Sequence, residues 1–238
     1  MNTAQQSTVF LIPTVLHENT EHTLPHYIID AVKQCQVFFV ENERTARRFL
    51  KRLWKEMVID DYIWVTIHKA EEPVTNEFVN FIRNNNCIGI ISEAGCPAIA
   101  DPGQVLVAAA HLHGATVKPL VGPSAILLAL MASGLNGQHF QFHGYLPIEN
   151  ALRSKELKQL ESESHKKNCT QLFIETPYRN NQMMEAILKS CQPGTLVSVA
   201  VDLTSENEWI RTMRVGEWKK QVPDLHKRPA IFSLLTAV

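Results

Sequence analysis

The chain has 238 residues, of which 45% are hydrophobic and 20% charged, and its formal net charge is −1. This is the composition of an ordinary globular protein, and a charge near zero gives no global sign of nucleic-acid or membrane binding. Five scattered cysteines without a CxxC pair argue against a disulfide framework or a thiolate metal site. The first residues, MNTAQQSTVFLIPT, do not resemble a signal peptide, so we expect a soluble cytoplasmic protein.

In the first half of the chain, short apolar runs alternate with amphipathic stretches. Strands are expected at Val9–Ile12, Val37–Val40, Ile63–Ile67, Ile88–Ile91 and Thr116–Leu120. Helices are expected at Leu24–Cys35, Thr45–Met57, Val74–Arg83 and Gln104–His113. This alternation predicts a parallel sheet with helices on both faces, whose ligands bind beyond the carboxyl ends of the strands.

The second half of the chain has a different pattern. Strands are expected at Phe140–Tyr145, Thr170–Ile174, Leu196–Val201, Thr212–Gly216 and Ala230–Leu235, and helices at Leu152–Glu161 and Asn181–Ser190. Thr212–Gly216 follows the preceding strand closely enough to predict an antiparallel hairpin. We therefore expect a two-domain α/β protein, with a parallel α/β domain over residues 1–119 and a mixed-sheet α+β domain over residues 120–238. A cleft between the domains is the expected ligand site.

Two loops fall on the functional edge of the predicted sheet. Residues 92–103, SEAGCPAIADPG, place two glycines and two prolines directly after a buried strand. Such a loop is stiff and lets a flat polar ligand such as adenosine approach its backbone, although a plain connecting loop has the same composition. Asp101 is placed to cap the following helix. In VGPSA, residues 121–125, Ser124 is placed as the N-cap of an apolar helical run, where an anionic group is favoured.

These loops resemble motifs of the ribosomal RNA small-subunit methyltransferase I family. SEAGCPAIADPG is similar to that family's SDAGTPLISDPG, and VGPSAILLALMASGL resembles its PGPSA…ASGL segment. Further on, FHGYLP resembles FEGFLP, FIETPYR resembles FYESPHR, and AVDLT resembles ARELT. The blocks occur in the family's order and span most of the chain. The family methylates a cytidine 2′-hydroxyl of 16S rRNA and belongs to the tetrapyrrole-methylase superfamily.

The resemblance implies that S-adenosylmethionine binds between two domains, usually in a homodimer. It assigns the following residues to the cofactor: Pro13, Glu93, Ala94, Gly95, Cys96, Ile99, Ser124, Ala125, Pro229 and Ala230. It also implies that the methyl acceptor lies beside the first loop and the second domain.

That first loop is where the chain departs most from the family. The family reads approximately PTPIGNLGDIT where this chain has residues 13–23, and only Pro13 and Thr14 are kept. The family's AEDTRHT is matched only in part by residues 40–46, and Glu93 replaces an aspartate. The changed loop contains four residues of metal-binding type: His17, Glu18, Glu21 and His22. We expect these to be surface residues and expect no metal site.

Glu175 follows a strand of the second domain, and Arg179 lies four residues further on. Methyl transfer from a sulfonium is an in-line displacement that needs alignment and the removal of one proton. Glu175 is a candidate for the base or for an orienting group, and Arg179 for holding a phosphate. The alternative is that the two side chains form a structural pair.

A run of cations follows helical spacing in the second predicted helix. Arg44, Arg47, Arg48, Lys51, Arg52 and Lys55 fall on one stripe, opposite an apolar side that includes Phe49 and Leu53. Such a stripe is typical of binding to a phosphate backbone. A solvated helix face, offset by nearby glutamates, is the other interpretation.

The leading hypothesis is therefore an S-adenosylmethionine-dependent methyltransferase that acts on RNA, most simply a ribose 2′-hydroxyl of rRNA. One alternative is a methylase of a small molecule such as a tetrapyrrole. Another is a degenerate member that binds the cofactor without turning it over, since the loop of residues 13–23 is altered. A Rossmann-type dehydrogenase is disfavoured because no GxGxxG follows the first strand.

Overall fold

The computed structural model describes residues 6–67 and 72–236. The chain divides into two compact units, Met1–Ser124 and Ala125–Val238, which we call the N-terminal and C-terminal units and describe separately. Within the described residues, no helix is both long and apolar enough to cross a membrane.

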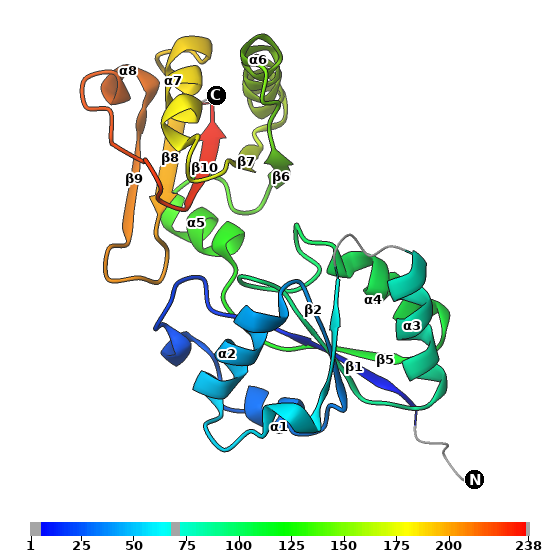
Figure 1. The fold of residues 1–238 in the computed structure, drawn as a ribbon. Helices are drawn as coiled ribbons and strands as arrows, with labels where there is room; N and C mark the ends of the chain where they lie inside the picture. Colours follow the sequence, from blue (N-terminus) through cyan, green and yellow to red (C-terminus); the bar gives the residue numbers. More distant parts are fainter. Residues whose placement is uncertain (1–5, 68–71, 237–238) are drawn as a thin grey trace. The chain divides into compact units, whose positions relative to one another are not determined.

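The N-terminal unit is built on a five-stranded parallel sheet (Figure 1). Its strands are β1 (Thr8–Ile12), β2 (Val37–Val40), β3 (Ile63–Thr66), β4 (Ile88–Ile91) and β5 (Thr116–Pro119), in the order β3-β2-β4-β1-β5. Its α-helices are α1 (Ile28–Val32), α2 (Glu43–Leu53), α3 (Glu72–Arg83) and α4 (Gly103–Leu112). The predicted parallel sheet is confirmed.

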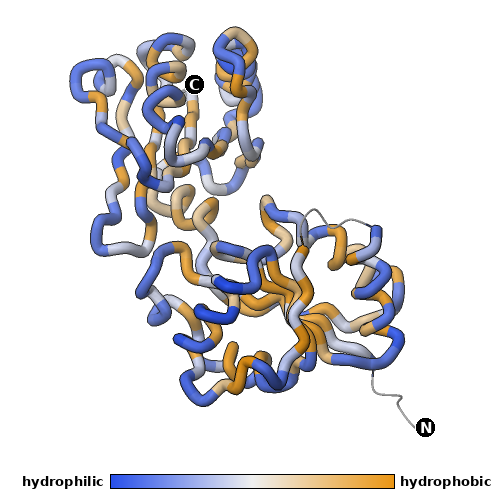
Figure 2. Tube along the Cα trace, viewed as in Figure 1, coloured by the Kyte–Doolittle hydropathy of each residue, from blue (hydrophilic) through white to orange (hydrophobic). Residues whose placement is uncertain are grey.

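The two faces of this sheet bury different side chains. Successive strand residues point to opposite faces, so Phe38 packs into one apolar cluster and Phe39 into the other. All four residues of β2 and of β4 are buried. The sheet is accordingly the most continuously hydrophobic part of this unit in Figure 2. Helices cover both faces, as expected for parallel strands.

Two helices of this unit differ from their predicted bounds by more than two residues at an end. The helix predicted over Leu24–Cys35 is reduced to α1 and a preceding 3-10 turn at Glu21–Thr23. Pro25 explains the delay, because a proline drives the residue before it out of the helical region, and Leu24 is extended (φ −101°, ψ 134°). The helix predicted over Thr45–Met57 begins earlier, at Glu43, because Asn42 caps it, and ends at Leu53.

The C-terminal unit contains a mixed sheet, as predicted. Its strands are β6 (Phe140–Tyr145), β7 (Thr170–Ile174), β8 (Leu196–Val201), β9 (Trp209–Arg214) and β10 (Ala230–Leu235), in the order β6-β7-β10-β8-β9. Its helices are α5 (Ala125–Ser133), α6 (Asn150–Lys167), α7 (Asn180–Ser190) and α8 (Val215–Trp218). Only β6 and β7 pair in parallel. The predicted antiparallel hairpin is confirmed as β8–β9, although β9 starts three residues earlier than predicted and ends at Arg214, directly before α8 begins.

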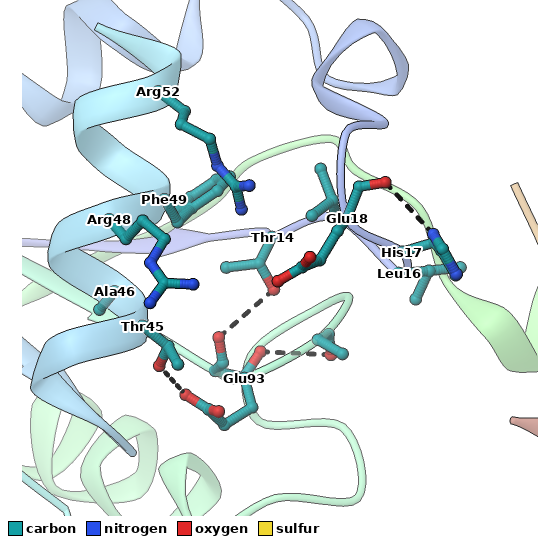
Figure 3. Close-up of a pocket in the computed structure, with 13 residues that line it drawn as sticks. Thr14, Leu16, His17, Glu18, Thr45, Ala46, Arg48, Phe49, Arg52 and Glu93 are labelled. Carbon is teal, nitrogen blue, oxygen red and sulfur yellow. Dashed lines mark hydrogen bonds between the residues drawn. The ribbon is translucent and has the colours of Figure 1, made fainter. Parts of the chain in front are cut away.

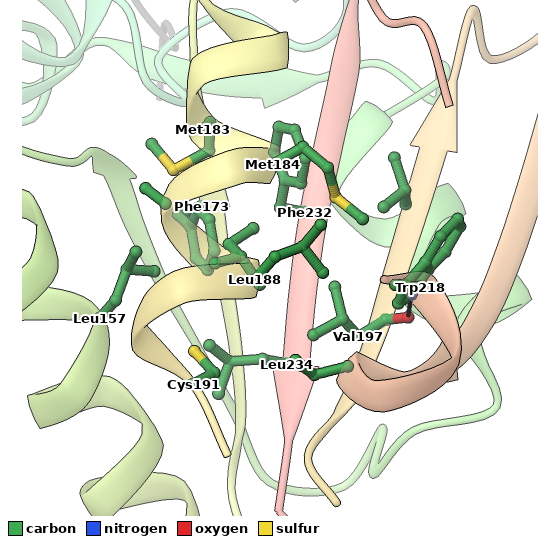
Figure 4. Close-up of a cluster of buried hydrophobic side chains, with 14 of the residues drawn as sticks. Leu157, Phe173, Met183, Met184, Leu188, Cys191, Val197, Trp218, Phe232 and Leu234 are labelled. Atoms are coloured by element: carbon green, nitrogen blue, oxygen red, sulfur yellow. Dashed lines mark hydrogen bonds between the residues drawn. The ribbon is translucent and has the colours of Figure 1, made fainter. Parts of the chain in front are cut away.

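The core of the C-terminal unit lies between its sheet and helices (Figure 4). The rings of Phe173 and Phe232, from neighbouring strands, stack with their centroids 5.8 Å apart. Trp218 of α8 is buried and donates a 3.0 Å hydrogen bond from Nε1 to the carbonyl of Val197. Because this core is separate from the two clusters of the parallel sheet, each unit has its own apolar interior.

Candidate functional site

Two hydrogen bonds from Thr14 join two loops at the carboxyl edge of the parallel sheet. β1 and β4 are neighbours in the sheet, so residues 13–23 and 92–102 leave it side by side. The amide of Thr14 donates a 2.8 Å hydrogen bond to the carbonyl of Gly95, and the Thr14 hydroxyl donates to the carbonyl of Ser92 at 3.3 Å. Thr14 is therefore the residue through which the altered first loop holds the predicted cofactor loop.

The loop of residues 92–103 has an unusual backbone. Gly95 (φ +75°), Ala98 (φ +66°) and Ala100 (φ +62°) all occupy the left-handed region, which alanine adopts at a cost. The Asp101 carboxylate holds this shape, because its Oδ1 accepts from the amides of Ala98 (3.0 Å) and Gly103 (2.7 Å). The cap predicted for Asp101 is thus displaced by one residue: Pro102 occupies the N-cap, and Asp101 binds the first helical amide from one position earlier.

Residues 121–124 approach the same edge. A Cβ added to Gly122 would lie 2.2 Å from Cβ of Pro13, so only glycine fits there. Cys96 donates from Sγ toward the carbonyl of Pro123 at 3.5 Å. Of the residues assigned to the cofactor by resemblance, the N-terminal unit therefore brings Pro13, Gly95 and Cys96 together around the segment that leads to Ser124.

Three carboxylates gather beside these loops. Glu41, directly after β2, accepts a 2.9 Å hydrogen bond from the amide of Glu93 at Oε1, and the Thr45 hydroxyl donates to the Glu93 carboxylate. Burial raises the pKa of Glu41, and the negative charges of Asp101 and Glu93 raise it further. Burial also raises the pKa of Asp101, against its backbone hydrogen bonds. This edge is acidic and attracts cations.

Glu41 was not among the site residues predicted from the sequence. The available signal was its place directly after the apolar strand VFFV, at the carboxyl end where parallel sheets bind ligands.

A pocket of about 230 Å³ opens where these segments meet helix α2 (Figure 3). It is lined by the first loop, by α2 and by the start of the loop after β4. The lining residues are Thr14, Val15, Leu16, His17, Glu18, Thr45, Ala46, Arg48, Phe49, Arg52, Ser92, Glu93 and Ala94. Figure 3 shows Arg48 and Arg52 reaching from α2 toward Glu18 of the first loop. One concave site thus combines predicted cofactor residues, predicted RNA-binding residues and the altered loop.

Some cations of the stripe on α2 have partners within the protein and others have no ion pair among the described residues. Arg47 pairs with Glu43 at 2.6 Å and lies over the Trp64 ring, and Arg52 pairs with Glu21 at 3.0 Å. Of the remaining cations, Lys51 donates to a backbone carbonyl, whereas Arg44 and Arg48 are exposed and form no ion pair within the described part of the chain. Lys55, predicted to lie on the same helical stripe, falls outside it because α2 ends at Leu53. The RNA-binding role of the stripe stays a prediction, and Arg48 is its member that both lines the pocket and lacks an acidic partner.

The four residues considered for a metal site do not act as a group. His17 and Glu18 line the pocket, and Glu21 is engaged with Arg52. Over residues 6–67 and 72–236, no cluster of three or more histidine, cysteine, aspartate or glutamate side chains could hold a metal ion.

The remaining residues assigned to the cofactor by resemblance lie in the C-terminal unit, apart from the exposed Ile99. Ala125 is the first residue of α5, and Ala230 is the first residue of β10. The carbonyl of Pro229 accepts a 3.0 Å hydrogen bond from the amide of Asp202, whose carboxylate pairs with Arg228 at 2.7 Å. Their contact with a cofactor stays a prediction.

Glu175 and Arg179 form an ion pair of 2.7 Å at the end of β7. The Glu175 side chain has no exposed surface, and its Oε1 also accepts from the amide of Thr176 at 2.6 Å. Its Oε2 and Nε of Arg179 have no hydrogen-bond partner among the described residues. The two side chains thus form the structural pair that was the alternative to a catalytic role. Their catalytic assignment stays a prediction.

No family model matches the chain. Comparison with curated proteins finds ribosomal RNA small subunit methyltransferase I of Vibrio cholerae, 33% identical over 212 residues that cover 88% of this chain and 69% of the relative. The chain belongs to the ribosomal RNA small subunit methyltransferase I family. A relative of the same name from Micromonospora olivasterospora is 29% identical over 90% of this chain, and the chain spans 65% of that relative's length. The predicted membership of a methyltransferase family is confirmed.

Solved structures of other methyltransferases share the fold. The methyltransferase CobJ superposes with a TM-score of 0.63 over 98% of this chain and 95% of its own, at 15% identity. Uroporphyrin-III-C-methyltransferase from Thermus thermophilus gives a TM-score of 0.55 over 97% and 94%, also at 15% identity. At such identity these likenesses concern the fold, and they agree with the two-unit α/β architecture of this member of the ribosomal RNA small subunit methyltransferase I family.

Proposed function

We propose that this chain transfers a methyl group from S-adenosylmethionine to a ribose 2′-hydroxyl of ribosomal RNA. The proposal is carried by one observation: in a member of this family, a single pocket joins the loop assigned to the cofactor with two arginines of the cationic stripe. A small-molecule acceptor does not need an unpaired guanidinium group such as that of Arg48 beside the site, whereas an RNA strand brings a phosphate with every nucleotide.

The chemistry of the sheet edge fits the proposed cofactor. S-adenosylmethionine carries a sulfonium and an ammonium group, and Glu41, Glu93 and Asp101 supply negative charge at this edge. The exposed start of the loop, Glu93 and Ala94, leaves backbone open to an adenosine, while the left-handed Gly95 turns the chain away. When bound, the cofactor supplies an electrophilic methyl group on a positively charged sulfur.

The protein's own contribution is alignment and the handling of one proton. Arg48 and Arg52 hold a phosphate of the acceptor strand in the pocket, which fixes the ribose before displacement. A proton must leave the hydroxyl as the new C–O bond forms. Glu18 lines the same pocket and is exposed, and it forms no ion pair within the described residues, so its carboxylate is placed to accept this proton.

Two further proposals follow from family membership. S-adenosylmethionine-dependent modification of ribosomal RNA is a cytoplasmic activity in bacteria, and we place the chain there. We also propose that it acts as a homodimer.

The decisive experiment incubates the protein with methyl-labelled S-adenosylmethionine and small ribosomal subunits that lack native methylation. We expect label in RNA, little label with Glu18→Gln, and full label with the matched control Glu77→Gln, an exposed carboxylate of α3. Calorimetry with the unlabelled cofactor runs in parallel. Binding without transfer would identify a regulatory member instead, and label confined to protein-free small molecules would identify a different acceptor.

A further inference from the structure

Arg153 is a buried cation without a counter-charge. It is 3% exposed, the lowest exposure of any arginine among the described residues, and it forms no ion pair there. Its Nη2 donates to Oδ1 of Asn150, its Nη1 lies 3.5 Å from the carbonyl of Ile148, and its Nε has no partner. Removing a charge from water without pairing it is strongly unfavourable, so this position calls for an anion.

The surroundings of Arg153 add positive potential. The residue lies in the first turns of the 18-residue helix α6, whose N-terminal end carries the positive pole of the helix dipole. Glu149, at the N-cap, makes no side-chain hydrogen bond to the helix. Other half-buried arginines of this unit have carboxylate partners, Arg179 with Glu175 and Arg228 with Asp202. Among the buried and half-buried arginines described in this unit, the most buried one is thus the one that lacks a carboxylate partner.

A pocket of about 370 Å³ lies against Arg153 and is lined by residues from the start of α6 and from the neighbouring helix α7. Its lining residues are Asn150, Arg153, Ser154, Gln182, Glu185, Ala186 and Lys189. Hydrogen-bond donors dominate this lining. Its one acid, Glu185, lies 3.4 Å from Lys189, which offsets its charge.

We propose that this pocket is an anion site for a phosphate group. A guanidinium presents a rigid fork of donors that matches phosphate oxygens, and the amide, hydroxyl and ammonium groups around it complete the shell. The phosphate comes either from a backbone phosphodiester of RNA, which rests on the proposed function, or from a free phosphate. Neither source of phosphate binds in the pocket beside α2. Phosphate binding at Arg153 can therefore be tested separately from methyl transfer.

The test measures the melting temperature of the whole chain in potassium phosphate and in potassium chloride of equal ionic strength and pH. Phosphate stabilises proteins generally, so the readout is the phosphate-specific rise of the wild type minus that of Arg153→Met. We expect Arg153→Met to lose the specific rise and Arg211→Met, an exposed arginine of the same unit, to keep it. In titrations, phosphate affinity should fall at least about tenfold in Arg153→Met, as expected for losing a charge-assisted hydrogen bond.

If Arg153→Met does not fold, Lys189→Met provides the same comparison with an exposed residue and should weaken phosphate binding about two- to threefold. A short single-stranded RNA that competes with phosphate identifies the backbone as the source, and failure to compete identifies free phosphate. An equal phosphate-specific rise in wild type and Arg153→Met, or unchanged phosphate affinity in Lys189→Met when the first variant is unfolded, overturns the proposal.

Discussion

Thr14 and Gly95 are joined by a 2.8 Å backbone hydrogen bond between the loops that follow β1 and β4. The loop of residues 13–23 lacks the glycines of the family's first loop. It is nevertheless hydrogen-bonded to the loop of residues 92–103, which has kept the family's glycines. The altered segment therefore remains tied to the loop assigned to the cofactor. We therefore expect the changes in the first loop to leave the proposed cofactor site in place.

Gly95→Ala should destabilise the protein by about 1–2 kcal/mol, because Gly95 has φ +75° and its added Cβ would lie 3.1 Å from Leu16 Cδ2. Gly114→Ala is the matched control: it has φ +73° with no atom within 4 Å of the added Cβ. Urea denaturation measures both, and calorimetry should show weaker S-adenosylmethionine binding only in Gly95→Ala. Equal costs and unchanged cofactor binding would mean that the contact with the first loop is unimportant.

Arg48→Met should weaken RNA binding and reduce the salt slope of log K by about 0.7–0.9, the loss of one phosphate contact. Arg47→Met should have a smaller effect, since Arg47 is already paired with Glu43 and stacked on Trp64. Arg83→Met, at the end of α3, controls for the loss of one charge. Binding of labelled RNA at several salt concentrations gives the slopes. Identical slopes for all three variants would show that the stripe is only solvated.

Glu41→Gln should raise stability at neutral pH while lowering affinity for S-adenosylmethionine. The folded pKa of Glu41 lies above its unfolded value, so the protonated form favours folding. Its contribution is fully present below the unfolded pKa, about 4.3, and is lost as pH rises through the raised folded pKa.

The wild type should therefore lose stability over this window, and Glu41→Gln should show a shallower loss. Asp101, whose pKa is also raised, keeps part of the effect. The amide oxygen of glutamine can still accept from Glu93 N–H, which isolates the charge. Calorimetric scans from pH 4 to 8 decide the matter, and a steeper loss in the variant would contradict it.

Arg179→Met should cost about 3 kcal/mol, because it leaves the fully buried Glu175 carboxylate without its cation. Glu175→Gln should cost less, and the double variant should recover much of the loss of Arg179→Met. A double-mutant cycle in urea measures this coupling. Additive costs would argue that the pair is not a structural unit. Retention of methyl transfer in a folded double variant would exclude a catalytic role.

Most strands of both units could be predicted because they are short apolar runs bounded by turn residues. Helix bounds were less accessible. The cap at Asn42 and the extended backbone at Leu24 are local features that set where a helix begins. The spacing of hydrophobic residues does not reveal them. Thr212–Gly216 placed the hairpin correctly but missed Trp209 and Ile210, because residues 209–214 are only partly buried or exposed and show little alternation.

The loops of the candidate site could be predicted from the sequence, but the contacts between them could not. Sequence resemblance pointed to residues 92–103. The hydrogen bond from Thr14 to Gly95, and the pocket that Arg48 shares with the first loop, arise from tertiary packing. Arg153 did carry a sequence signal. It stands at helical spacing with Leu157 and Leu160, which places a charge on the buried face of α6.

The contact between Gly122 and Pro13 constrains how this chain can diverge. With 2.2 Å between a Cβ at position 122 and that of Pro13, any larger residue at 122 requires a change at position 13 first. The two positions lie 109 residues apart in sequence. In related sequences, we therefore expect a replacement of Gly122 only where Pro13 has already been replaced. Because this chain retains Pro13, position 122 has to remain glycine in it.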